Sequence, residues 1–228
     1  IVWALFRSRW SIIVLIVILL GGKLHFRVFS WASDDTRASR TELSILSYNV
    51  RLFDRYNPSR AESQITKNKI FDHLNTEQPD IVCFQEFYHQ DLPTSFSTKD
   101  SLKSLLKSVD FHERYQHKLN GRQNFGVAMF SKYPIIKKGD VIFSKTERSN
   151  NHCIYIDIVK NRDTFRVYNV HLQSIKLQKD DYALFNETSD ASEESSSFFK
   201  LYSKIKNSYP ERAKQAKLVS DHLKNSPY

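Results

Sequence analysis

The fold is decided by four short stretches of the sequence: LSYNVRLFD (46–54), PDIVCFQEF (79–87), GVAMFSKYPI (126–135) and YNVHLQS (168–174). Each contains an apolar run whose composition is typical of a buried β-strand. In three of them the run leads directly into Asn, Glu or His. Scaffolds commonly present functional side chains where strands end, so these stretches predict both a sheet and a site.

The remaining apolar patterns predict further strands with helices between them. Strands are expected over 43–50, 81–84, 125–130, 135–143, 154–159 and 165–172, and helices over 61–74, 101–109, 198–206 and 211–224. Residues 186–197 (NETSDASEESSS) are acidic and rich in serine, which predicts a loop. The strands between 125 and 172 are separated by gaps of turn length. Such short gaps favour antiparallel or mixed pairing.

The N-terminal part of the chain has a different character. SIIVLIVILLGG (11–22) is an apolar run without charge between Arg9 and Lys23. It predicts a membrane-embedded segment over 1–31, followed by a polar linker over 32–42 and a folded domain over 43–228. A signal peptide and a buried core helix are the alternatives. A bacterial cell membrane is therefore the expected location, with either orientation open.

Composition and charge restrict the function only broadly. The 228 residues are 40% hydrophobic, which is enough for a packed core, and the net charge is +9. Four of these positive charges fall in 1–30, so the domain carries a modest excess. This excess fits an anionic substrate or lipid head group, and equally a lysine-rich soluble surface. Cys83 and Cys153 form no C-x-x-C pair, so no zinc or redox motif is indicated. No obligate protein partner is evident.

Glu86 and Asn49 are candidate residues for binding a metal ion or a phosphate. A carboxylate at the end of a core strand is costly to bury unless it is paired or binds a cation. Mg²⁺ prefers oxygen ligands and often takes only one or two protein carboxylates. Glu86 fits that role, or it reaches solvent. The amide of Asn49 could hold a phosphate oxygen or a catalytic group, or it could cap a turn.

Asn169 and His171 are two residues apart on a predicted strand, so they share one face of it. An imidazole beside an amide suits a phosphate site, because histidine can donate to a phosphate oxygen. A hydrogen-bonded structural pair is the alternative.

In this order, the four stretches resemble the endonuclease/exonuclease/phosphatase family of metal-dependent phosphoesterases. The resemblance covers about 44–228. It implies an α/β fold, a four-layer α/β/β/α sandwich in which two mixed β-sheets pack face to face between outer helices. It also implies hydrolysis of a phosphate ester by metal-assisted, in-line attack of water. The substrate would be a phosphodiester of nucleic acid or phospholipid, or a phosphomonoester.

The resemblance implies a role for each candidate residue. Glu86 matches the principal ligand of Mg²⁺, or of Mn²⁺ in its place. Asn49 matches an asparagine that organises metal and phosphate. His171 matches a histidine that contacts the scissile phosphate, and Asn169 supports it. The rival hypothesis is a non-enzymatic, membrane-tethered module that binds nucleic acid or anionic lipid head groups.

The chain departs from the family pattern in its later motifs. No G-D-x-N occurs, since Gly139-Asp140 is followed by Val141 and Ile142. Ser220-Asp221-His222 has the letters of the family's last motif, S-D-H, but lies in a helical pattern, so we interpret it as a coincidence. We therefore expect that the chain stops before the family's last motifs. Without the groups that activate water, this chain should be nearly inactive.

Overall fold

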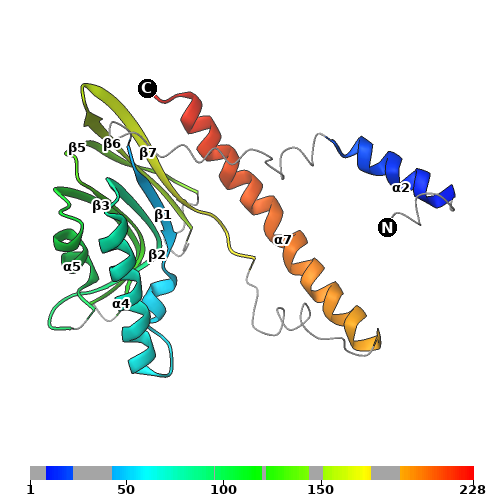
Figure 1. Cartoon of the computed structure of the whole chain (residues 1–228), viewed down its shortest axis with the longest axis horizontal. Helices are drawn as coiled ribbons and strands as arrows, with labels where there is room; N and C mark the ends of the chain where they lie inside the picture. The colour runs from blue at the N-terminus through cyan, green and yellow to red at the C-terminus, as the bar shows by residue number, and fades with distance from the viewer. Residues whose placement is uncertain (1–8, 23–42, 95, 120–121, 144–150, 176–190) are drawn as a thin grey trace. The chain divides into compact units, whose positions relative to one another are not determined.

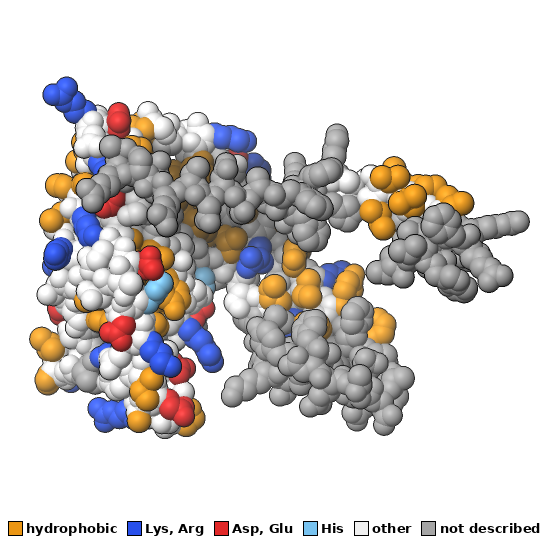
Figure 2. Space-filling model, viewed as in Figure 1, with side chains coloured by type: hydrophobic (Ala, Val, Ile, Leu, Met, Phe, Trp, Pro, Cys, Tyr) orange, Lys and Arg blue, Asp and Glu red, His pale blue; other side chains and the backbone are white. Residues whose placement is uncertain are grey.

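The computed structural model describes residues 9–22, 43–94, 96–119, 122–143, 151–175 and 191–228. The chain forms two compact units, Ile1–Glu42 and Leu43–Tyr228. In the first, the sequence of α2 (Arg9–Leu20) is apolar on all sides, and its described hydrophobic side chains, Ile12 and those of 15–20, are exposed (Figure 2). Within the described residues, no helix is both long and apolar enough to cross a membrane. The prediction of a membrane-embedded segment over 1–31 is therefore not supported. Residues 1–8 and 23–31 and the linker at 32–42 lie outside the described residues.

Two β-sheets form the body of the second unit (Figure 1). The first has the order β1-β2-β4-β3, and the second has the order β5-β6-β7. The strands are β1 (Ile45–Asn49), β2 (Ile81–Gln90), β3 (Asp110–Leu119), β4 (Gln123–Ser131), β5 (Ile135–Val141), β6 (His152–Lys160) and β7 (Asp163–His171). β1 and β2 are parallel, with Asn49 opposite Gln85, and every other pair is antiparallel.

Three apolar clusters show how the layers stack. Between the sheets, Cys83 and Met129 of the first pack with Ile154 and Ile156 of the second. The opposite face of the first sheet is covered by α4 (Arg60–Glu77) and α5 (Thr98–Leu105). The opposite face of the second sheet is covered by α7 (Ala191–Lys224), which contributes Val219. The predicted four-layer α/β/β/α sandwich is thus confirmed. Its first sheet is mixed, and its second is antiparallel over the described strands.

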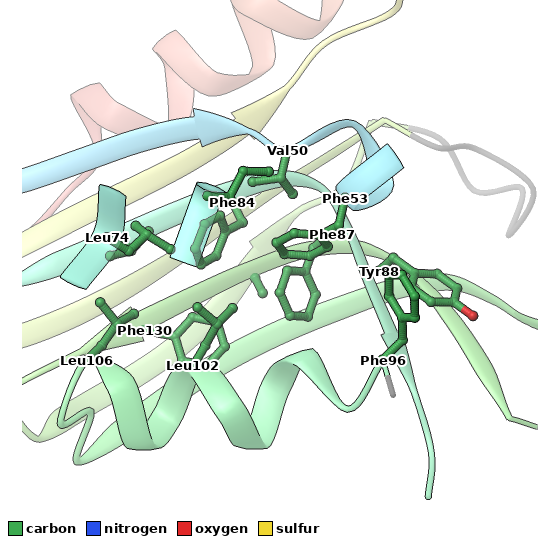
Figure 3. Packing of buried hydrophobic residues seen from close by; sticks show 13 residues of the cluster. Val50, Phe53, Leu74, Phe84, Phe87, Tyr88, Phe96, Leu102, Leu106 and Phe130 are labelled. Atoms are coloured by element: carbon green, nitrogen blue, oxygen red, sulfur yellow. The ribbon is translucent and has the colours of Figure 1, made fainter. Parts of the chain in front are cut away.

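The cluster beneath the helices is dominated by aromatic rings (Figure 3). Phe84 is fully buried at its centre, with ring centroids 5.6 Å from Phe87, 5.8 Å from Phe130 and 6.4 Å from Phe53. Leu74 of α4 and Leu102 of α5 are also fully buried in this cluster. Strand β2, which contains most of the PDIVCFQEF stretch, is buried along most of its length. Helices cover one of its faces, and the second sheet covers the other.

Helix α4 begins at a capped residue. The Ser59 hydroxyl accepts a hydrogen bond from the Glu62 backbone N–H at 3.3 Å. Ser59→Ala leaves that N–H without its partner and should lower the free energy of unfolding by about 1 kcal/mol. Urea unfolding followed by circular dichroism measures the change. The control is Ser101→Ala on α5, where a helical serine is replaced by a better helix former. Equal stability of Ser59→Ala and the unmodified chain would contradict the capping role.

Strand β3 was not predicted. Its sequence, DFHERYQHKL, is mostly polar, because β3 is an edge strand hydrogen-bonded to β4 alone. Among the described side chains of β3, Phe111 and Tyr115 pack against the aromatic cluster. Two apolar residues four positions apart do not distinguish a strand from a helix.

The prediction of two helices after a loop was wrong at the C-terminus. Residues 191–224 form one helix with Pro210 inside it, and only 186–190 of the predicted loop lie outside the described residues. Proline usually ends a helix because it lacks the N–H and crowds the preceding turn. Here Leu201, Ser208 and Gln215 are buried at intervals of seven residues, so one helix face stays covered across Pro210.

Candidate functional site

A β-bulge directs Glu86 out of the core. The pairing of β2 with β4 shifts register between Phe84 and Phe87, and Glu86 has a φ of 50°. A positive φ is strained for any residue except glycine, and a bulge re-aims the side chain at that point. Phe84 and Phe87 consequently both enter the aromatic cluster, while Glu86 between them is about one-third exposed.

Three side chains meet at this bulge. The Asn49 Nδ2 atom donates to Glu86 Oε1 at 3.0 Å, and His171 Nε2 lies 3.6 Å from the same oxygen. Asn49 and Glu86 come together because β1 and β2 are parallel neighbours in which Asn49 pairs with Gln85, the residue before Glu86. His171 arrives from the other sheet, at the end of β7.

The surroundings of Glu86 favour its charged form. His171 is the main cause that holds the pKa of the Glu86 carboxyl below its usual range. The hydrogen bond from Asn49 and the positive charge of Arg51 act in the same direction, and partial burial opposes them. Glu86 is therefore a carboxylate at neutral pH, which is the form that binds cations.

Behind these groups, Gln85 and Asn169 tie the two sheets together. Gln85 Nε2 donates to Asn169 Oδ1 at 2.7 Å and to Ser47 Oγ at 3.1 Å. Asn169 Nδ2 in turn donates to the carbonyl oxygens of Phe84 at 2.8 Å and Ala128 at 3.1 Å. Asn169 is only 1% exposed, and its amide ties β7 to β2 and β4, while its supporting role beside His171 stays a prediction.

The three converging groups line a cleft of about 540 Å³. The wall also includes Ser47, Gln85, the segment after β7 and Arg212 of α7. Carboxylate, amide, imidazole and guanidinium groups thus face one space, a combination that suits a metal ion and an anion together.

The sequence of residues 46–222 matches the endonuclease/exonuclease/phosphatase family. This range contains all four deciding stretches and every residue of the site. The chain belongs to that family.

Three of the solved structures that are similar to this chain are described by their identity, coverage and TM-score. An endonuclease/exonuclease/phosphatase family protein from Leptotrichia buccalis is 18% identical over 66% of this chain and 63% of its own, with a TM-score of 0.44. TDP2 of D. rerio in complex with a single-strand DNA product is 18% identical over 63% of this chain and 52% of its own, with a TM-score of 0.42. A beta toxin of Staphylococcus aureus is 22% identical over 59% of this chain and 52% of its own, with a TM-score of 0.39.

The chain spans between 42% and 63% of the length of the first three solved structures that it matches. No curated protein matches its sequence.

The donor set around Glu86 fits one divalent ion only in part. Glu86 Oε1 is occupied by Asn49 and His171, whereas Oε2 makes no hydrogen bond within the described part of the chain. That oxygen is available as a ligand for Mg²⁺, which fills its remaining positions with water and phosphate. No cluster of three His, Cys, Asp or Glu side chains exists among the described residues. The Asn49 Oδ1 atom accepts from the Arg51 N–H at 3.0 Å, so the role of Asn49 as a metal ligand stays a prediction.

The Ser220-Asp221-His222 triplet lies away from this cleft. His222 Nδ1 is 2.8 Å from the hydroxyl of Tyr168, and Asp221 pairs with Lys217. Tyr168 points to the face of β7 opposite to that of Asn169, since alternate strand residues face opposite sides. His222, which belongs to α7, therefore packs against Tyr155 and Tyr168 on the outer face of the second sheet and does not line the cleft.

The residues that line the cleft but were not singled out as functional from the sequence include Ser47, Gln85 and Arg212. The available signal for Ser47 was its two-residue spacing from Asn49, and for Gln85 its two-residue spacing from Cys83. Such spacing places two residues of a strand on the same face. For Arg212 the only signal in the sequence was that Gln215 follows one helical turn later. Polar residues at this spacing occur in any amphipathic helix, so the signal was not specific.

Proposed function

We propose that the 43–228 unit binds the metal ion and the phosphate group in a site that hydrolyses phosphate esters with Mg²⁺. The supporting observation is the convergence of Asn49, Glu86 and His171, from three strands far apart in sequence, on one cleft. When bound, the metal ion would neutralise charge on the phosphoryl oxygens and the leaving group.

Each residue of the site has a defined role in this proposal. Glu86 would hold the ion through its carboxylate. Asn49 keeps the carboxylate oriented through its 3.0 Å hydrogen bond. His171, only 16% exposed beside Glu86, donates to a phosphate oxygen. Gln85 and Asn169 fix the distance between β2 and β7, so the phosphate-binding and metal-binding groups stay in register.

The 228 residues contain no G-D-x-N motif, so no group is assigned to activate the attacking water. Base activation commonly contributes about 10²–10⁴-fold to the rate. We therefore expect slow hydrolysis by the 228-residue chain that depends on Mg²⁺ and stops with EDTA. The assay uses excess protein over long incubations with single-stranded DNA, choline phospholipid vesicles and p-nitrophenyl phosphate.

The control pair in this assay is His171→Ala and His73→Ala. His73 is exposed on α4 and does not line the cleft, so its replacement should leave the rate unchanged. Hydrolysis that persists in EDTA, or that is insensitive to His171→Ala, would contradict the proposed function. Rapid, Glu86-dependent turnover would instead show that the chain already holds a base.

A further inference from the structure

We infer that Arg212, on helix α7, is the phosphate-binding cation of the cleft. The inference deepens the proposed function and rests on it for the nature of the ligand. Arg212 lines the same cleft as Asn49, Glu86 and His171, although it comes from the helix that covers the second sheet. The proposal assigns the outer helix a direct role at the site.

Arg212 is held in place by the segment that follows His171. Its Nη1 atom donates to the Gln173 carbonyl oxygen at 2.7 Å. One turn later, Gln215 Oε1 accepts from the Gln173 backbone N–H at 2.8 Å, and Gln215 is 2% exposed. Both backbone polar groups of Gln173 therefore bond to α7. The Gln173 side chain is fixed as well, since its Oε1 accepts from Asn151 at 2.6 Å.

The charge of Arg212 is not neutralised by a carboxylate within the described residues. The arginines Arg114 and Arg166 form ion pairs with Asp140 and Asp157, whereas Arg212 forms none. Its neighbour Glu211 is within ion-pair distance of Lys214. A guanidinium fork has several N–H donors, and one bond to Gln173 leaves the others for a ligand. Such a fork matches two oxygens of a phosphate group.

Two roles must be separated, because Arg212 both bonds Gln173 and carries charge. Arg212→Gln and Gln215→Leu each remove one hydrogen bond to Gln173, but only the first removes a cation. We expect Arg212→Gln to weaken binding of inorganic phosphate by about 10- to 100-fold, and Gln215→Leu by less than about threefold. Arg212→Lys keeps the charge without the fork and should fall between them.

Phosphate binding to the 228-residue chain is measured by titration calorimetry with and without Mg²⁺ at two salt concentrations. Thermal unfolding of each variant checks its fold. Lys214→Gln is the matched control, since Lys214 lies on the same helix, is highly exposed and does not line the cleft. Binding by Arg212→Gln should also be less sensitive to salt than binding by the unmodified chain.

Equal losses for Arg212→Gln and Gln215→Leu would reduce Arg212 to a structural clamp and overturn the inference. Unchanged phosphate affinity in folded Arg212→Gln or Arg212→Lys would also overturn it. Weaker phosphate binding in Arg212→Gln, from a chain that hydrolyses no ester, would uphold the inference while the proposed function fails. Mg²⁺-dependent hydrolysis with an unchanged KM in Arg212→Gln would uphold the proposed function and overturn the inference about Arg212.

Discussion

Glu86→Gln is expected to weaken Mg²⁺ binding by at least about 100-fold, because residues that merely orient a metal ligand are already worth about 10- to 100-fold. Glu86 is the carboxylate proposed to bind the ion. The glutamine keeps the size of the side chain and can still meet Asn49 and His171. The substitution therefore removes the negative charge with little change in packing. Titration calorimetry with Mg²⁺, repeated with Mn²⁺, measures the effect.

The control for this experiment is Glu77→Gln. Glu77 is an exposed carboxylate at the end of α4 and should not affect the affinity. Asn49→Leu should have an intermediate effect, since it removes the hydrogen bond to Glu86 Oε1 and leaves the carboxylate in place. Unchanged Mg²⁺ affinity in Glu86→Gln would remove the basis for a metal site at the bulge.

Phe84→Ala is expected to lower the free energy of unfolding by about 3–5 kcal/mol. The ring is fully buried on the central strand of the first sheet, in contact with Phe53, Phe87 and Phe130. Its removal would leave a cavity beneath α4 and α5 that these rigid rings cannot fill. Urea denaturation of the 228-residue chain gives the change in the unfolding free energy.

The matched control for Phe84 is Phe165→Ala on β7. Phe165 is 38% exposed, so the same truncation there should cost less than about 2 kcal/mol. A similar small loss for Phe84→Ala would mean that the aromatic cluster does not hold the first sheet to its helices.

The sequence allowed the meeting of Asn49, Glu86 and His171 to be predicted, although β2 continues past Glu86 to Gln90 where a strand end was expected. Asn49, Glu86 and His171 each follow an apolar run, and such runs have few ways to pack besides central strands. Their convergence follows from the parallel β1–β2 pair and from the stacking of β7 on it. The bulge at Glu86 was not predictable in this way, because a non-glycine residue with positive φ has no sequence signature of its own.

Other features were missed because tertiary contacts decide them. Strand β3 is polar and is a strand only because β4 offers its free edge. Helix α7 continues through Pro210 because one of its faces stays buried. Arg212 reaches the cleft because α7 lies against the segment after β7. These features depend on neighbours that periodicity within a single segment cannot indicate.

The most direct test of the metal and phosphate site uses the paramagnetism of Mn²⁺. The 228-residue chain is titrated with substoichiometric Mn²⁺ in the presence of inorganic phosphate, and the histidine ring protons and the phosphorus signal are followed by NMR. Our account predicts selective broadening of His171 and of phosphate, with His73 and His222 remaining sharp, and loss of the effect on His171 in Glu86→Gln. Broadening of His73 or His222 while His171 stays sharp would contradict it.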